Sequence, residues 1–281
     1  MRRLIINADD YAMAPGIDEA IVELAHRGIV TSTSAMVLSP RWPYAGRQLN
    51  LSELDCGLHL DLTSEFAHAS GAGWSLGRLL VRTHTGQIDR IGLRGSIERQ
   101  LDRFEDALNE APRFVDGHEH VHQLPLVRDL LMQVLDQRYG AQAAFVALRS
   151  CMSRRWRGGK AALIAYLGAG SVTRRSARER RLVNSDFVGV YDFSADVCLP
   201  DLWRRWLADL RGPWPLAMCH VSKGGGALTD SIQAARSQEY AWLASEAFWD
   251  LCAEYAIVPS RWPHPWNPVH EPHDHTEQLA G

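Results

Sequence analysis

The sequence predicts an α/β fold with a parallel sheet, and three observations support this prediction. Short runs rich in apolar or β-branched residues alternate along the chain with amphipathic stretches of helical period. Polar clusters follow several of these runs, where the sites of parallel α/β proteins lie. The 281 residues are compatible with a single domain. Right-handed β-α-β connections fit either a doubly wound sheet or a barrel.

The first half of the chain supplies the clearest elements. Leu4 to Ile6 is a short apolar run that ends in polar Asn7 and two aspartates, and Pro15 opens an amphipathic helix that Gly28 ends. Further strands are expected at 29–38, 56–62 and 113–118. Helices are expected at about 43–49 and around residues 97–108, with Pro112 ending the second.

The second half continues the alternation less regularly. Helices are expected at 125–138 and 239–254, and strands at 143–148, 187–193 and 216–221. The arginine-rich segment 150–181 surrounds an apolar stretch and predicts a helical excursion, whose cations fit a solvated face better than an anion site. We expect the domain to span 1–258. The Pro- and His-rich tail 259–281 fits loose packing better than a metal site, despite its histidines His264, His270, His273 and His275.

Bulk properties exclude several protein classes. A net charge of −3 gives no sign of a nucleic-acid partner. No window approaches the roughly 20 apolar residues of a membrane span, and the N-terminal segment lacks a signal-peptide core, so a cytoplasmic protein is expected. The five cysteines are scattered without a C-x-x-C pair, which argues against a disulfide framework or a zinc knuckle.

Three polar clusters are predicted to meet at one rim of the sheet. They are the pair Asp9-Asp10, His59, and the segment 116–122. Asp10, His59 and His118 form a one-carboxylate, two-histidine set that suits one divalent ion with open positions. Adjacent residues of an extended strand point to opposite sides, so both aspartates reach one site only if the backbone bends there. We therefore expect Asp10 to bind the ion and Asp9 to act as the base.

Other residues are expected to support the ligands and the base. If the strand continued past residue 118, His118, His120 and His122 would share a face with Asp116. His120 and His122 are expected to orient ligands or substrate, and Asp116 to accept a proton from a ligating imidazole. His220 follows another strand and is either a general acid, as an imidazolium near neutral pH, or a structural histidine. Two further alternatives concern Arg149, which either orients Asp9 or forms a surface salt bridge.

These residues resemble the pattern of the YdjC-like carbohydrate deacetylases, a family that includes chitooligosaccharide and hopanoid-associated deacetylases. The resemblance extends to about Tyr255 and rests on five segments: 7–11, 28–34, 57–63, 116–122 and 218–220. It implies a distorted (β/α) barrel similar to polysaccharide-deacetylase barrels, often dimeric, with Mg²⁺ or Zn²⁺ bound. It also implies Asp9 as base and Asp10, His59 and His118 as ligands.

The expected reaction is metal-dependent hydrolysis of the acetamido group of an N-acetylated amino sugar, on a small oligosaccharide or glycoconjugate, with release of acetate. Two departures from the family pattern, at Tyr11-Ala12 and after His220, leave the sugar undefined. The alternatives are a metal-dependent phosphoesterase or another amidohydrolase, and a degenerate protein that binds sugar or metal without turnover.

Overall fold

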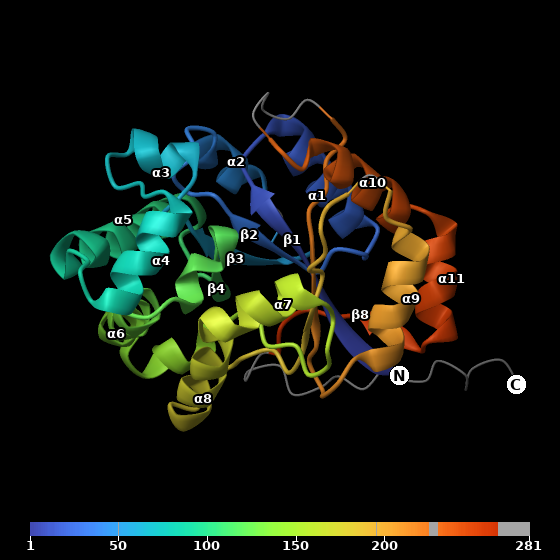
Figure 1. Cartoon of the computed structure of the whole chain (residues 1–281). Coiled ribbons are helices and arrows are strands. Elements are labelled where there is room, and N and C mark those ends of the chain that lie inside the picture. Colours follow the sequence, from blue (N-terminus) through green and yellow to red (C-terminus); the bar gives the residue numbers. More distant parts are fainter. Residues whose placement is uncertain (50, 195, 225–229, 264–281) are drawn as a thin grey trace, which may run out of the picture.

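The structure is a computed structural model that describes residues 1–49, 51–194, 196–224 and 230–263. Its centre is a parallel sheet with the strand order β5-β4-β3-β2-β1-β7-β6, and β8 pairs with the start of β1 (Figure 1). The strands are β1 (Arg2–Tyr11), β2 (Ser32–Ala35), β3 (Asp55–Leu60), β4 (Phe114–Gly117), β5 (Ala147–Leu148), β6 (Phe187–Val188), β7 (Leu216–Cys219) and β8 (Ile257–Pro259).

The sheet curls into part of a barrel. Neighbouring strands follow the chain order from β1 to β5, and β6 and β7 return to the other side of β1. Between β5 and β6 the described residues form no ladder, and Leu148 makes only an isolated parallel bridge to Val183. The predicted α/β class and barrel-like architecture are therefore confirmed, with this one interruption.

Helices surround the sheet (Figure 1). Their apolar side chains are buried against it. In α1 (Pro15–His26), Pro15 begins the helix, while Ile17, Ile21 and Leu24 are fully buried at helical spacing. Gly28 follows the helix end with φ of 70°, as expected for a stop. Further helices around the sheet are α2 (Trp42–Gln48), α5 (Arg90–Leu108), α6 (Val127–Tyr139), α9 (Leu199–Asp209), α10 (Gln233–Leu243) and α11 (Glu246–Glu254).

Several element boundaries differ from the predicted ones. The expected helix at 239–254 is two helices, because the chain breaks at Ala244 and the hydroxyl of Ser245 caps α11. Two helices, α3 (Glu65–Ala69) and α4 (Leu76–Thr85), lie between β3 and α5, where no element was predicted. Asn109, in the left-handed conformation, ends α5 before Pro112 is reached.

Three predicted strands are much shorter than expected. Only four residues of 29–38 pair as β2, and 140–145 forms a 3₁₀ helix that leaves two residues for β5. The strand expected at 187–193 ends at Val188, because Gly189 adopts φ of 112° with its Cα against the Met218 carbonyl of β7. The apolar composition of a segment gives no sign of close tertiary contacts such as that between Gly189 and β7.

The basic segment contains α7 (Gly159–Ile164), a π-helical turn (Ala165–Ala169) and α8 (Gly170–Arg178). Several of its cations are engaged within the fold: Arg157 pairs with buried Asp186, and Arg175 pairs with Asp129. No helix among the described residues is long and apolar enough to cross a bilayer.

The C-terminal boundary of the domain lies beyond the expected position at residue 258. The Ser260 amide donates to the Leu4 carbonyl, and the Trp262 ring is buried in a stack on Phe114. Residues 259–263 therefore pack with the domain instead of beginning a tail. The histidines of the predicted tail, from His264 onward, lie outside the described residues.

Candidate active site

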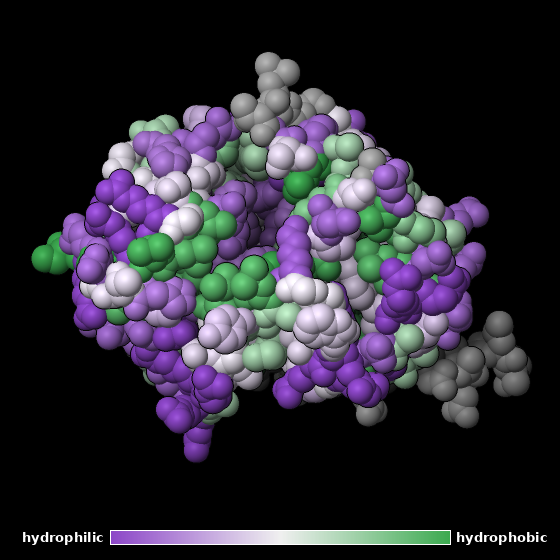
Figure 2. Space-filling model, viewed as in Figure 1, coloured by the Kyte–Doolittle hydropathy of each residue, from purple (hydrophilic) through white to green (hydrophobic). Residues whose placement is uncertain are grey.

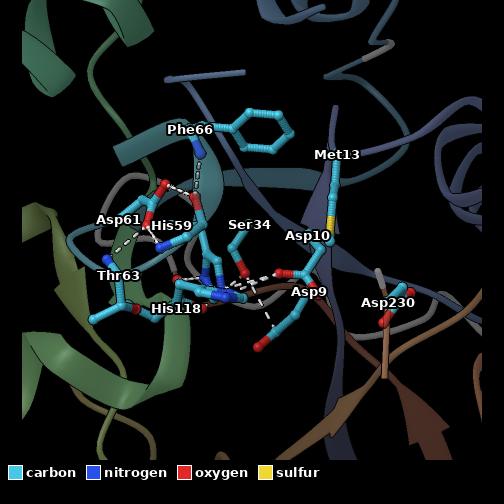
Figure 3. Close-up of polar contacts among 12 residues, drawn as sticks. Asp9, Asp10, Met13, Ser34, His59, Asp61, Thr63, Phe66, His118 and Asp230 are labelled. Carbon is cyan, nitrogen blue, oxygen red and sulfur yellow. Dashed lines mark hydrogen bonds and ion pairs between the residues drawn. The ribbon is translucent and has the colours of Figure 1, made fainter. Parts of the chain in front are cut away.

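The site begins with a bend in β1. The pairing register of β1 against β2 shifts between Ala8 and Tyr11, and Asp10 has φ of 72°. Aspartate tolerates this left-handed conformation better than most residues, although it is still strained. The bend allows the adjacent Asp9 and Asp10 carboxylates to turn toward the same group of polar side chains (Figure 3). This is the backbone distortion that the sequence argument required.

The three predicted metal ligands come together. Oδ1 of Asp10 lies 3.4 Å from Nε2 of His59 and 3.3 Å from Nδ1 of His118. One ligand atom from each residue lies within 4.8 Å of the others. His59 and Asp10 are buried, whereas the His118 side chain keeps 23% of its surface exposed, which gives the group an open side.

The atoms of His59 and Asp10 that point away from the cluster are bound by other residues. The atoms that point toward one another therefore remain available for a cation. Nδ1 of His59 contacts Oδ1 of Asp116 at 2.6 Å, and Oδ2 of Asp10 accepts a hydrogen bond of 2.7 Å from Arg236. Backing of this kind fixes imidazole and carboxylate ligands in metal sites. The donor set of one carboxylate oxygen and two imidazole nitrogens therefore fits a divalent ion.

Charges keep the carboxylates ionised. Burial alone would raise the pKa of Asp9 and of Asp10. The surrounding charges and hydrogen bonds, with Arg149 foremost at Asp9 and Arg236 at Asp10, together outweigh burial, so both pKa values lie well below the usual range. Burial likewise opposes protonation of His59, yet Asp116 and Asp10 raise its pKa to about 10 when no ion is bound. The cluster therefore carries protons where an ion would sit.

Asp9 occupies a different environment from Asp10. One guanidinium nitrogen of Arg149 donates to both its oxygens, at 2.7 and 2.9 Å, and the Asn7 amide donates to Oδ1 at 2.7 Å. The same Arg149 nitrogen lies 2.9 Å from Asp116, which also accepts from the Ser34 hydroxyl at 2.8 Å. Arg149 is fully buried, so the surface-salt-bridge alternative is wrong and the orienting contact with Asp9 is present.

The segment after β4 does not continue as a strand. Residues His118–Gln123 form a 3₁₀ helix, and Glu119 and His120 have φ of 50° and 60°. His118, His120 and His122 therefore do not share a face with Asp116, because the chain turns at once after Gly117. This prediction was wrong.

The turn separates the three histidines. His118 alone joins the cluster, while Nδ1 of His120 lies 3.5 Å from the Cys151 sulfur and Nε2 of His122 bonds to the Arg149 carbonyl at 2.8 Å. Burial holds the pKa of His122 at about 4, so this ring is a neutral donor to the backbone of Arg149. His122 supports the arginine that orients Asp9.

His220 lies just past β7, on the other side of β1. Its backbone amide donates to buried Glu239 at 3.0 Å, and its ring meets the edge of Phe193 with centroids 5.2 Å apart. Burial lowers its pKa to about 4, although the charges of Asp10 and Asp9 oppose this shift. The resting ring is therefore neutral, which corrects the expectation of an imidazolium near neutral pH.

Several residues of the site were not predicted from the sequence. Arg236 and Glu239 lie on the buried face of α10 and contact Asp10 and the His220 amide, respectively. Tyr191 donates its hydroxyl proton to Glu239 at 2.8 Å, and Ser34 links Asp116 to Asp9. The segment containing Ser34 was expected only as a strand and as part of the family motif, and no local pattern marks Arg236 or Glu239.

The site opens to solvent at the carboxyl ends of the strands. Figure 2 shows a hollow with hydrophilic walls where Figure 1 places the end of β1. Fold and site together define the chain as a parallel α/β protein with a candidate metal centre beside a buried, arginine-bound carboxylate. The model of the family described as YdjC-like protein matches residues 3–254, and the chain belongs to that family.

Similar proteins agree with this assignment. A carbohydrate deacetylase from Mus musculus is 33% identical over 152 residues, which cover 50% of this chain and 49% of that protein. A chitooligosaccharide deacetylase from Yersinia pestis (strain Pestoides F) is 30% identical over 135 residues, covering 46% and 53%. The chain thus spans about half the length of the curated relatives it matches.

A solved structure shares the fold over a longer range. The Enterococcus faecalis V583 protein, provisionally described as a cellobiose-phosphate cleavage protein, superposes with a TM-score of 0.70 and 19% identity. The match covers 92% of this chain and 97% of that one. At this identity the similarity concerns the fold alone.

Proposed function

We propose that the chain is a metal-dependent N-deacetylase that hydrolyses the acetamido group of an acetylated amino sugar and releases acetate. The observation that carries the proposal is the division of the Asp9-Asp10 pair. Asp10 turns toward two imidazoles, and Asp9 is bound by an arginine. The names of the similar mouse and Yersinia proteins support a carbohydrate substrate.

Asp10, His59 and His118 would hold the ion, Mg²⁺ or Zn²⁺. When bound, the ion polarises the acetyl carbonyl and lowers the pKa of water. The partly exposed side of His118 leaves room for solvent and substrate next to the three ligand atoms. Asp116 orients His59 through Nδ1, so the proton of that ring sits on the nitrogen that faces away from the ligand cluster.

Asp9 is the proposed base. A base must be ionised and held within reach of the attacking water. The pKa of Asp9, lowered by Arg149, keeps the carboxylate ionised at neutral pH, and the contacts with Arg149 and Asn7 fix its orientation. Because Asp9 and Asp10 each form a cluster with His59, the base lies next to the ligand group.

His220 is the proposed acid for the leaving amine. Its resting ring is neutral, so it must gain a proton before it can donate one. The negative charges of Asp9 and Asp10 favour the protonated ring, and Nδ1 of His220 has no partner among the described residues. We propose that the proton taken from water reaches the amine through His220.

The test is an acetate-release screen on N-acetylglucosamine, its short oligomers and other N-acetylated sugars. Chelated protein is compared with protein reloaded with Mg²⁺ or Zn²⁺. Acetate release only after reloading supports the proposal. Release of phosphate from phosphorylated sugars without acetate would favour a phosphoesterase, and ion binding without turnover of any substrate would favour a binding protein.

A further inference from the structure

One face of α10 reaches into the ligand cluster. Arg236 and Glu239 are three residues apart, so they project from the same side of the helix, and both are buried. Arg236 contacts Asp10, and Glu239 contacts the backbone of His220. A helix that contributes no predicted ligand or base thus touches both Asp10 of β1 and His220 after β7.

Arg236 joins two carboxylates that come from distant parts of the chain. Its terminal nitrogen donates to Oδ2 of Asp10 at 2.7 Å, and its Nε donates to Oδ2 of Asp230 at 2.6 Å. All three side chains are at most 5% exposed. A buried guanidinium requires such compensation, because burial without partners is costly.

The backbone of Arg236 is also engaged. Its carbonyl accepts a hydrogen bond from the Ser222 amide, two residues after His220. Arg236 therefore binds the segment after β7 through its backbone and Asp10 through its side chain. This arrangement fixes Arg236 from two directions and limits its freedom to follow a displaced Asp10.

We propose that Arg236, anchored by Asp230, is a positioning residue that holds Asp10 as a one-oxygen metal ligand and thereby sets the affinity of the site for its ion. Since Oδ2 of Asp10 is occupied by Arg236, Oδ1 alone is presented to His59 and His118. The inference rests on the ligand set of the proposed function.

The conformation of Asp10 explains why an anchor is needed. Its left-handed backbone persists only when the surroundings hold it, and a free carboxylate in a bent strand has several rotamers. Loss of a supporting contact of this kind typically lowers metal affinity by about 10- to 100-fold. A purely structural ion pair would instead change stability and leave affinity unchanged.

The experiment measures Zn²⁺ affinity by competition with a chromophoric chelator, with no turnover involved. The variants are Arg236→Gln, Asp230→Asn and the double variant, with thermal unfolding recorded for each. Arg157→Gln is the matched control, because Arg157 forms a buried ion pair with Asp186 outside the ligand cluster. His59→Ala reports on the ligand set itself.

We expect Arg236→Gln to weaken Zn²⁺ binding by about 10- to 100-fold and Asp230→Asn to weaken it less. The double variant should match Arg236→Gln, because both changes act through one guanidinium. Arg157→Gln should lower the melting temperature without changing affinity. Asp230→Asn, which keeps the guanidinium, decides the question if Arg236→Gln does not fold.

Two results would overturn the inference while the ligand set stands. In the first, His59→Ala loses Zn²⁺ while Arg236→Gln, or Asp230→Asn where only that variant folds, binds it like the wild-type protein. In the second, the effects of Arg236→Gln and Asp230→Asn add in the double variant. Failure of the wild-type protein to bind Zn²⁺ would overturn both the inference and the proposed ligands.

Discussion

Asp9 and Asp10 are adjacent in the chain, yet each is bound by a different buried arginine. Arg149, just after β5, donates to Asp9, and Arg236 of α10 donates to Asp10. The two arginines approach β1 from opposite sides, since β5 and β7 lie on different sides of it in the sheet and Arg236 packs near the end of β7. Each carboxylate therefore has its own arginine to keep it ionised and can serve a separate role.

Removal of the proposed base should abolish turnover without releasing the ion. We expect Asp9→Asn to lower kcat by about 10²- to 10⁴-fold, the usual contribution of a general base, because an amide cannot accept the proton of water. Zn²⁺ affinity should stay within a few-fold of wild type. Acetate release and chelator competition measure the two effects, and full activity of the variant would remove Asp9 from the mechanism.

Asp116 should matter for metal binding although it is not a proposed ligand. Asp116→Asn weakens the acceptor at Nδ1 of His59, so Zn²⁺ affinity should fall by about 10- to 100-fold. Asp55→Asn is a matched control, because Asp55 is a buried aspartate at the opposite end of β3, bound by Arg261. Equal affinities of the two variants would contradict the supporting role of Asp116.

The metal-free protein should lose stability in mild acid. His122 and His220 have pKa values of about 4 in the fold, below their ordinary 6.5. Between these values the unfolded chain binds protons that the native state does not, so stability falls as pH is lowered from 6.5 to 4. The pKa values of His59 and His118 are raised in the fold, so these residues change the pH dependence of stability only above pH 6.5.

Three histidines contribute in this window, because burial also lowers the pKa of His120. Buried Glu239, whose pKa is raised to about 8, offsets about one of them, so we expect a net slope of about 3 kcal/mol per pH unit. Urea unfolding in the presence of a chelator, at several pH values, measures it. The His122→Asn variant should lower the slope of stability against pH to roughly half of its wild-type value. An unchanged slope would show that His122 is not buried as a neutral ring.

Gly189 should tolerate no side chain. A Cβ there would lie 2.1 Å from the Met218 carbonyl oxygen, and φ is 112°. Gly189→Ala should therefore destabilise the protein by about 2 kcal/mol or more. Gly77→Ala in α4 is the control, since a Cβ there meets nothing within 4 Å and the change should be neutral or stabilising by up to about 1 kcal/mol. Equal melting temperatures would contradict the clash.

The alternation of strands and helices and the strand-end location of the polar clusters could be predicted because they depend on local periodicity. Asp9, Asp10 and His59 follow apolar runs, and the carboxyl ends of parallel strands meet at one edge of the sheet. The need for a bend at the aspartate pair also followed from strand geometry alone, and the bulge in β1 supplies it.

The remaining features depend on tertiary contacts. Positive φ values at Glu119 and His120 turn the chain directly after β4, and nothing in an alternating run of histidines marks that turn. Arg236 acquires its role only when α10 packs beside β1, more than 200 residues along the chain from Asp10. The pKa of His220 follows from burial, which the sequence around it did not reveal.

The interrupted ladder between β5 and β6 has a mechanical consequence. Other sides of the barrel are joined by rows of main-chain hydrogen bonds. This side has an isolated main-chain bridge at Leu148 and relies in addition on side chains such as Asn184, which bonds to the amide and carbonyl of Ser150. A ladder survives the exchange of any one side chain, because its bonds belong to the backbone. Among the residues that the structure describes, the β5–β6 side of the barrel lacks such a ladder, so its stability is more sensitive to the substitution of a single residue.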